Sequence, residues 1–126
     1  DYATVDLYTG NMEITKIGAA ASFLRHKDEV VCLSSSSLPA GVNMQQIIRP
    51  QEAKMCHGDF LVMVTDGVIE YLHVKNPEEK LAEMISEIKT DHAGNMARTL
   101  LEHVLLFTGG HAMDDMTIIV TGIWEK

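Results

Sequence analysis

Cysteine, proline, aromatic residues and positive charge are all scarce in this sequence of 126 residues. Two cysteines, Cys32 and Cys56, do not make the disulfide framework of a small secreted domain, so we expect reduced thiols in a cytosol. Ten Lys and Arg against 18 Asp and Glu give a net charge of −8, which argues against a nucleic-acid or anionic-membrane surface. No apolar run approaches the roughly 18 residues of a membrane-spanning helix, and no signal peptide is recognisable. Because the sequence begins without Met, a longer protein could carry targeting segments upstream.

Histidine is better represented, with six residues, but none has the spacing to cysteine that zinc sites use. Cys56-His57 is the only close pair, and it precedes Gly58 in what we expect to be a turn. A surface turn explains this pair better than a zinc site does.

An apolar fraction of 46% is enough for one domain with a core. In the first half of the chain, alternating and β-branched residues predict strands. These cover Ala3–Tyr8, Asn11–Ile17, Ser22–Arg25 and Glu29–Leu33, followed by a mostly extended stretch over Gln45–Met55. We expect the first four strands to form one β-meander, and Pro50 to hold the extended stretch at a sheet edge or bulge.

In the second half the apolar period changes from two to about three and a half. Asn76, Pro77 and Glu79 form a capping-box pattern that predicts the start of a helix. Its apolar stripe is Leu81, Met84, Ile85 and Ile88. A second helix is predicted over Ala93–Phe107, ended by Gly109-Gly110. Its inward residues are expected to be Ala97, Leu100, Leu101, Val104 and Thr108.

Two stretches place acidic residues at the ends of apolar strands. Phe60–Val64 is short and wholly apolar, as in a strand covered on both faces, and it runs straight into Thr65-Asp66-Gly67. Asp114 and Asp115 precede a second apolar strand, Met116–Trp124. If the two strands are antiparallel neighbours, the end of one lies beside the start of the other, and three carboxylates gather at one rim of the sheet. Such oxygen-only clusters suit hard divalent ions such as Mg²⁺ or Mn²⁺.

Each acidic motif alone is ambiguous, because Asp-Gly is a common turn dipeptide and acidic pairs usually lie in water. Their combination at the ends of the two most apolar strands favours a metal site, since negative charge rarely collects at the rim of a core without compensation. The helix pair can cover one face of these strands and a second sheet the other. We therefore predict α/β layers, with one sheet packed on another and helices outside.

These motifs resemble those of a known family. Thr65-Asp66-Gly67-Val68 and Asp114-Asp115-Met116-Thr117 are similar to the last two metal motifs of the metal-dependent PPM (PP2C-like) Ser/Thr protein phosphatases. Ile17–Arg25, Leu38–Gly41 and Gly58-Asp59 stand where the bacterial branch carries its AG-x-P-x, LP-x-G and pGD signatures. The likeness covers nearly the whole chain in the right order and is greatest to the phosphatase domain of the stage II sporulation protein E branch.

The resemblance implies an α+β fold, a layered α-β-β-α sandwich of two antiparallel sheets flanked by helices. It also implies hydrolysis of phosphoserine or phosphothreonine. Two Mn²⁺ or Mg²⁺ ions would activate the attacking water, and no protein nucleophile is required. Asp66 matches the family's central metal ligand and Asp114 the late one. Asp115 stands where many relatives have Asn, which implies a role beside the ligands, with direct ligation as the alternative. Gly67 would let the backbone approach the ion closely.

The sequence also departs from the family. The first metal motif, an acidic residue followed by Asp-Gly on an early strand, is absent. We therefore expect residues 1–126 to be a single phosphatase domain that is incomplete at its N-terminus, without the N-terminal strands and first helix. Ala20-Ala21 replaces the proline of the Gly-x-x-Pro signature. With half of the ligand set, this chain alone is expected to be weakly active or inactive, and its open sheet edge invites homodimerisation.

The implied substrate is a phosphoprotein, by resemblance an anti-anti-sigma factor in sporulation. Full-length relatives are membrane-anchored with this domain in the cytoplasm, so no membrane contact by this segment is expected. The alternative is a catalytically inactive phosphatase-like module that binds a regulatory partner. Retention of Asp66 and Asp114 favours the enzyme, because a scaffold has no need of carboxylates at the rim.

Other polar residues have simpler interpretations. His111 could donate a proton to a leaving group, although an exposed loop histidine explains it as well. Ser34–Ser37 is expected to be a plain surface loop rather than a phosphate site. Arg25 and Lys27 are expected to be cations of the turn that contains Asp28, rather than phosphate contacts.

Overall fold

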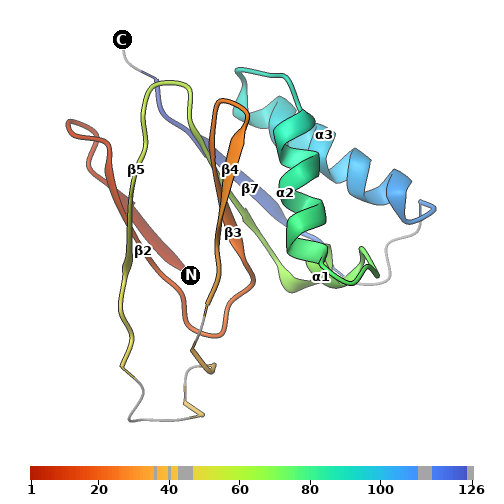
Figure 1. The fold of residues 1–126 in the computed structure, drawn as a ribbon, viewed down its shortest axis with the longest axis horizontal. Helices are drawn as coiled ribbons and strands as arrows, with labels where there is room; N and C mark the ends of the chain where they lie inside the picture. The colour runs from red at the N-terminus through yellow and green to blue at the C-terminus, as the bar shows by residue number, and fades with distance from the viewer. Residues whose placement is uncertain (36, 40, 43–46, 111–114, 125–126) are drawn as a thin grey trace.

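The computed structural model describes residues 1–35, 37–39, 41–42, 47–110 and 115–124. They form β1 (Tyr2–Val5), β2 (Asn11–Thr15), β3 (Ser22–His26), β4 (Glu29–Leu33), β5 (Gln51–Lys54), β6 (Phe60–Val64), α1 (Asp66–Glu70), α2 (Pro77–Glu87), α3 (Ala93–Phe107) and β7 (Ile118–Gly122). One sheet has the order β1-β2-β5 and the other β4-β3-β6-β7, and every pairing is antiparallel. The helices lie on the outer face of the four-stranded sheet (Figure 1). The prediction of an α+β sandwich of two antiparallel sheets with helices is confirmed.

Strand β6 is covered on both faces, as its unbroken apolar sequence predicts. Phe60, Val62 and Val64 pack into the core beneath the helices. Leu61 belongs instead to a second core between the two sheets, where Met12 and Ile14 of β2 are also fully buried. The four-stranded sheet is therefore the middle layer of the molecule, and the ends of β6 are fixed from both sides.

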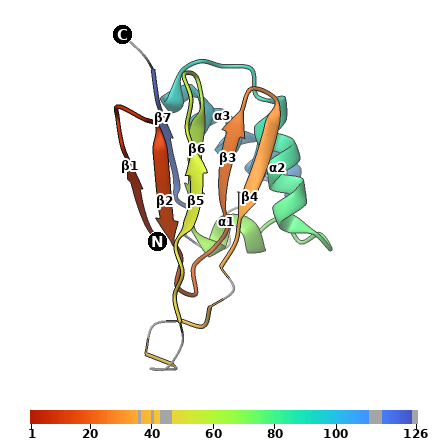
Figure 2. The same cartoon turned by 60° about the vertical axis from the view of Figure 1, so that its left-hand side comes forward.

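The predicted single meander is wrong, because β1 and β2 lie in one sheet while β3 and β4 lie in the other (Figure 2). The chain changes sheet in the link between Lys16 and Ser22. Gly18 in this link has φ +55, and a Cβ there would approach the Cα of Pro39 to 2.5 Å. Only glycine fits both the left-handed conformation and the close contact, so the small-residue link is the crossing point between the layers.

Four strands are shorter than predicted, and one of them is β2, which ends at Thr15 rather than Ile17. β1 ends at Val5 because the Asp6 carboxylate accepts hydrogen bonds from the backbone N–H groups of Tyr8 (2.8 Å) and Thr9 (3.2 Å), which starts a turn. The ladder of β7 covers only Ile118–Gly122. β5 covers only Gln51–Lys54, and as an edge strand directly after Pro50 it agrees with the position expected from the proline.

Helix α2 begins where predicted, α3 has the predicted bounds, and the apolar stripes of both are core. Leu81, Met84, Ile85 and Ile88 are all buried. On α3, Leu100 and Val104 are buried as expected, and Met96 joins them in place of Ala97, which is only partly buried. The capping box is not formed, because the Asn76 side chain donates to the carboxylate of Glu79 (2.7 Å) instead of accepting a backbone N–H. None of the helices in the described ranges is long and apolar enough to span a membrane.

Candidate metal site

The ends of β6 and β7 are bonded together where the sequence places its acidic motifs. The antiparallel ladder runs from Phe60 opposite Gly122 to Val64 opposite Ile118. One residue further on, the N–H of Thr65 donates to the carbonyl of Thr117 (3.1 Å), and the N–H of Thr117 donates to Oγ1 of Thr65 (2.9 Å). The expectation that these strands are antiparallel neighbours is confirmed, and the corners outside them share one rim.

Asp66 opens α1 and is exposed, while Gly67 behind it is buried. Oδ1 of Asp66 accepts the N–H of Gly67 (3.0 Å). Asp115 is exposed and lies two residues before Thr117. Asp114 and His111 lie outside the described residues. Within the described ranges, Asp66 and Asp115 do not belong to a group of three closely spaced His, Cys, Asp or Glu ligand atoms, so their binding of metal stays a prediction.

A cavity of about 180 Å³ adjoins Asp66 and is strongly acidic. Glu70 and Glu78 line it together with Asp66, and among the described residues none that lines it is basic. Glu70 lies four residues after Asp66, one turn along α1, so the helical spacing could have indicated it. Glu78 comes from the first turn of α2 and reaches the cavity through helix packing, for which the sequence carries no local signal. Carboxylates collected without a counter-charge suit a hard divalent cation.

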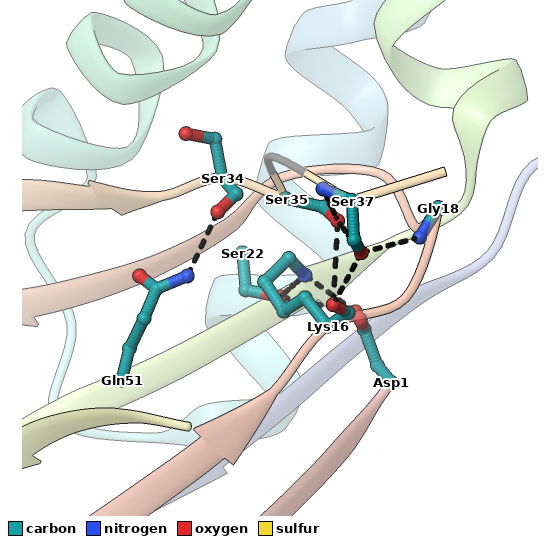
Figure 3. Close-up of polar contacts among 8 residues, drawn as sticks. All are labelled: Asp1, Lys16, Gly18, Ser22, Ser34, Ser35, Ser37 and Gln51. Atoms are coloured by element: carbon teal, nitrogen blue, oxygen red, sulfur yellow. Dashed lines mark hydrogen bonds and ion pairs between the residues drawn. The ribbon is translucent and has the colours of Figure 1, made fainter. Parts of the chain in front are cut away.

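Lys16 lies buried beside this rim in a small polar network (Figure 3). Its ammonium donates to Oδ2 of Asp1 (2.6 Å) and to Oγ of Ser22 (2.8 Å). Burial lowers the pKa of Lys16, even with the Asp1 carboxylate in contact. Asp1 also lines a second cavity, of about 240 Å³, with Thr65 and Thr117. The network joins the end of β2 to the start of β3 at the acidic rim, and sequence reasoning did not find it.

The serine loop is anchored rather than free. Oγ of Ser35 and Oγ of Ser37 donate to the carbonyl of Lys16, at 3.3 and 3.0 Å (Figure 3). The N–H of Gly18 donates to Ser37, and the Gln51 amide donates to the carbonyl of Ser34 (2.8 Å). The described serines lie in a loop, as expected, and their hydroxyls tie this loop to the crossing between the sheets.

Arg25 is buried in the core and also interacts with the turn after β3, as expected of a turn cation. It is buried, its guanidinium carbon lies 5.8 Å from the centre of the Phe60 ring, and its Nε donates to the carbonyl of Lys27 (2.6 Å). The Asp28 carboxylate forms its ion pair with Lys89 (2.5 Å). Burial lowers the pKa of Arg25, and the charge of Asp28 opposes this lowering by a smaller amount. Because Arg25 pairs with Phe60 at the start of β6, it lies at the end of the sheet away from Asp66.

Known structures share this arrangement of sheets and helices. The PP2C phosphatase domain of the cell fate determinant SpoIIE from Bacillus subtilis, solved with a fragment of its regulatory domain, matches with a TM-score of 0.85 at 29% identity, over 92% of this chain and 35% of that one. A Mn-presoaked structure of the phosphatase domain matches with a TM-score of 0.85 at 26% identity, over 100% of this chain and 56% of that one. The chain therefore has the fold of a PP2C-type phosphatase domain.

Sequence comparison identifies the family within the PP2C-type phosphatases to which the chain belongs. The stage II sporulation protein E of Priestia megaterium is 33% identical over 121 residues, which are 95% of this chain and 21% of that protein. Residues 1–123 match the model of the stage II sporulation protein E (SpoIIE) family. The chain belongs to that family, and it spans about a fifth of the length of this curated relative.

Proposed function

We propose that this chain is part of a metal-dependent phosphatase that removes phosphate from phosphoserine or phosphothreonine on a regulatory protein. The observation that carries the proposal is the pair of hydrogen bonds between Thr65 and Thr117. These bonds hold the corner of Asp66 against the segment that follows Asp115, at the rim where the acidic cavity opens. Because a metal-activated water would attack the phosphate, the proposal requires no nucleophilic side chain.

The residues present fit a hard divalent ion, since the described residues that line the cavity beside Asp66 offer carboxylate and hydroxyl oxygens as their charged or polar side-chain groups. Bound Mn²⁺ or Mg²⁺ ions would supply an activated water and charge stabilisation at the phosphoryl group. In this proposal Asp66 and Asp114 ligate, Asp115 supports the ligands or binds directly, and Gly67 leaves room beside the ion.

Family membership supports a phosphoprotein of the anti-anti-sigma-factor kind as the substrate, met in the cytoplasm. The sequence contains no counterpart of the family's first metal motif, so we propose that these 126 residues alone are at most weakly active. Full turnover of a phosphopeptide by this chain with Mn²⁺ would refute that part of the proposal. Exposed strand edges at β1 and β7 could also pair with a second copy, which sedimentation at rising concentration would detect.

The test is a calorimetric titration of Mn²⁺ into the chain and into its Asp66→Asn variant. We expect the variant to bind at least about 10-fold more weakly, since it loses a charged ligand. Asp91→Asn, which removes an exposed carboxylate from the loop between α2 and α3, is the matched control and should bind as the parent does. Equal and negligible binding by the parent and Asp66→Asn would favour the inactive interaction module instead.

A further inference from the structure

A second group of metal-ligand side chains lies at the opposite end of β6. His26 ends β3, while Cys56 and Asp59 belong to the turn between β5 and β6. One ligand atom from each of these three residues lies within 4.8 Å of the others. Asp59 directly precedes the first residue of β6, and Asp66 lies two positions after the last, so the length of the strand separates this group from the acidic rim.

The Asp59 carboxylate is fixed by the backbone around it. It is only 2% exposed, and its Oδ2 accepts the N–H of Cys56 (2.7 Å). The backbone N–H of Asp59 donates to the carbonyl of Cys56 (3.0 Å). The backbone N–H of Ile123, the residue after β7, donates to the carbonyl of Asp59 (3.3 Å). Its other oxygen, Oδ1, lies 2.7 Å from Nδ1 of His26. One carboxylate oxygen is thus held in place, and the other faces the imidazole.

We propose that His26, Cys56 and Asp59 form a binding site for a zinc-type ion. Thiolate, imidazole and carboxylate are the donors that Zn²⁺ prefers, and three protein ligands leave the fourth tetrahedral position to water. The hydrogen bond to Oδ2 is the supporting contact that metal-binding carboxylates usually have. A thiolate disfavours Mg²⁺ and Mn²⁺, so this site selects a softer ion than the acidic rim does.

The distances require only side-chain movement. Ligand atoms on a tetrahedral zinc ion lie about 3.3–3.6 Å apart, given bonds of about 2.0–2.3 Å. His26 and Asp59 must separate by roughly 0.6 Å from their present 2.7 Å. The ion then takes the place of the hydrogen between Nδ1 and Oδ1, and the neutral imidazole that ligates through Nδ1 carries its proton on Nε2. His26 and Cys56 are both exposed, so they can turn toward an ion arriving from solvent, and the Cys56 thiol releases its proton to the buffer on binding.

Such an ion would clamp the β3–β4 turn to the β5–β6 turn. His26 and Asp59, one from each turn, lie 33 positions apart in sequence. Because the ion would bind the folded chain and not the unfolded one, it would raise the thermal stability. Sequence spacing could not find the site, because its histidine comes from β3 and not from His57 beside the cysteine.

The experiment titrates Zn²⁺ by calorimetry and Co²⁺ by absorption into the whole chain. We expect Zn²⁺ binding in the parent, weakened about 10–100-fold in His26→Gln and in Cys56→Ser. Cobalt should give a thiolate-to-metal charge-transfer band in the parent that Cys56→Ser loses. Cys32→Ser and His103→Gln, matched replacements elsewhere, should keep both signals, as should Asp66→Asn.

Two results would overturn the proposal. One is a parent that binds Zn²⁺ no more tightly than Cys56→Ser. The other is a cobalt band that survives in Cys56→Ser and disappears in Cys32→Ser. The Asp66→Asn titration measures Mn²⁺ binding at the other end of β6. A negative result for the zinc site therefore leaves the test of the proposed phosphatase function unaffected.

Discussion

Strand β6 carries an aspartate near each end, and the two residues differ in almost every physical respect. Asp59 before the strand is 2% exposed, with a hydrogen-bond partner on each carboxylate oxygen. Asp66 after the strand is exposed, and its described hydrogen bond is to the neighbouring N–H of Gly67. The same residue type is built into the fold at one end and left available at the other.

This difference shows how a carboxylate can be assigned from its surroundings. A buried charge is tolerated only where hydrogen bonds replace its water, so Asp59 is committed to the β5–β6 turn. An exposed carboxylate beside other carboxylates is not needed by the fold, and here Asp66 shares its cavity with Glu70 and Glu78. Stability should therefore depend on Asp59, and binding of a hard cation on Asp66.

The largest expected effect is the loss of stability in Asp59→Ala. The substitution removes the acceptor for the Cys56 N–H and the partner of His26, and hydrogen bonds to a charged group contribute about 1.5–3 kcal/mol each. We expect the free energy of unfolding to fall by about 3 kcal/mol, measured from urea midpoints at constant m. Asp66→Ala is the matched control and should change it by less than about 0.5 kcal/mol. Similar losses from both variants would abolish the distinction between the two ends.

A smaller effect is expected at Thr65, which joins the acidic corners without being a ligand. Thr65→Val removes the hydroxyl that accepts the N–H of Thr117 and keeps the side-chain shape. We expect a loss of about 1 kcal/mol in unfolding free energy, together with weaker Mn²⁺ binding. Thr121→Val, at an exposed position on β7, should change neither quantity. Unchanged Mn²⁺ affinity in Thr65→Val would show that the hydrogen bonds do not position the site.

Elements with strong local patterns could be predicted from the sequence. The apolar run of β6 and the stripes of α2 and α3 set their own bounds, because burial on one or both faces is written in the residue order. The pairing of β6 with β7 was the condition on which the predicted metal site depended, and the antiparallel ladder meets it. Asp66 could be identified as a candidate because it follows directly on the apolar run of β6 and its turn residue Thr65.

Features that depend on long-range packing could not be predicted. Alternation shows that β2 and β3 are strands, but it does not say that the Gly18 link carries the chain from one sheet to the other. Nothing in the sequence pairs Lys16 with Asp1, or brings Glu78 to Asp66. His26 meets Asp59 because β3 pairs with β6, a register that spacing along the chain does not reveal.

The smallest effect is expected at Asp28, which distinguishes the influence of burial from that of position in the sheet. Asp28 lies in the β3–β4 turn, at the same end of the sheet as Asp59, but it is exposed like Asp66. The hydrogen bond from Lys89, with its charge, lowers the pKa of Asp28 below the ordinary value of 3.8. A carboxylate with a lowered pKa in the folded state stabilises the fold above its unfolded pKa, and this contribution disappears as the pH falls through the lower folded value. Asp28→Asn should therefore melt slightly below the parent at pH 7, by less than either variant above, and the difference should vanish on acidification below the folded pKa. A difference as large as that of Asp59→Ala, or one that grows in acid, would mean that position at this end of the sheet outweighs burial.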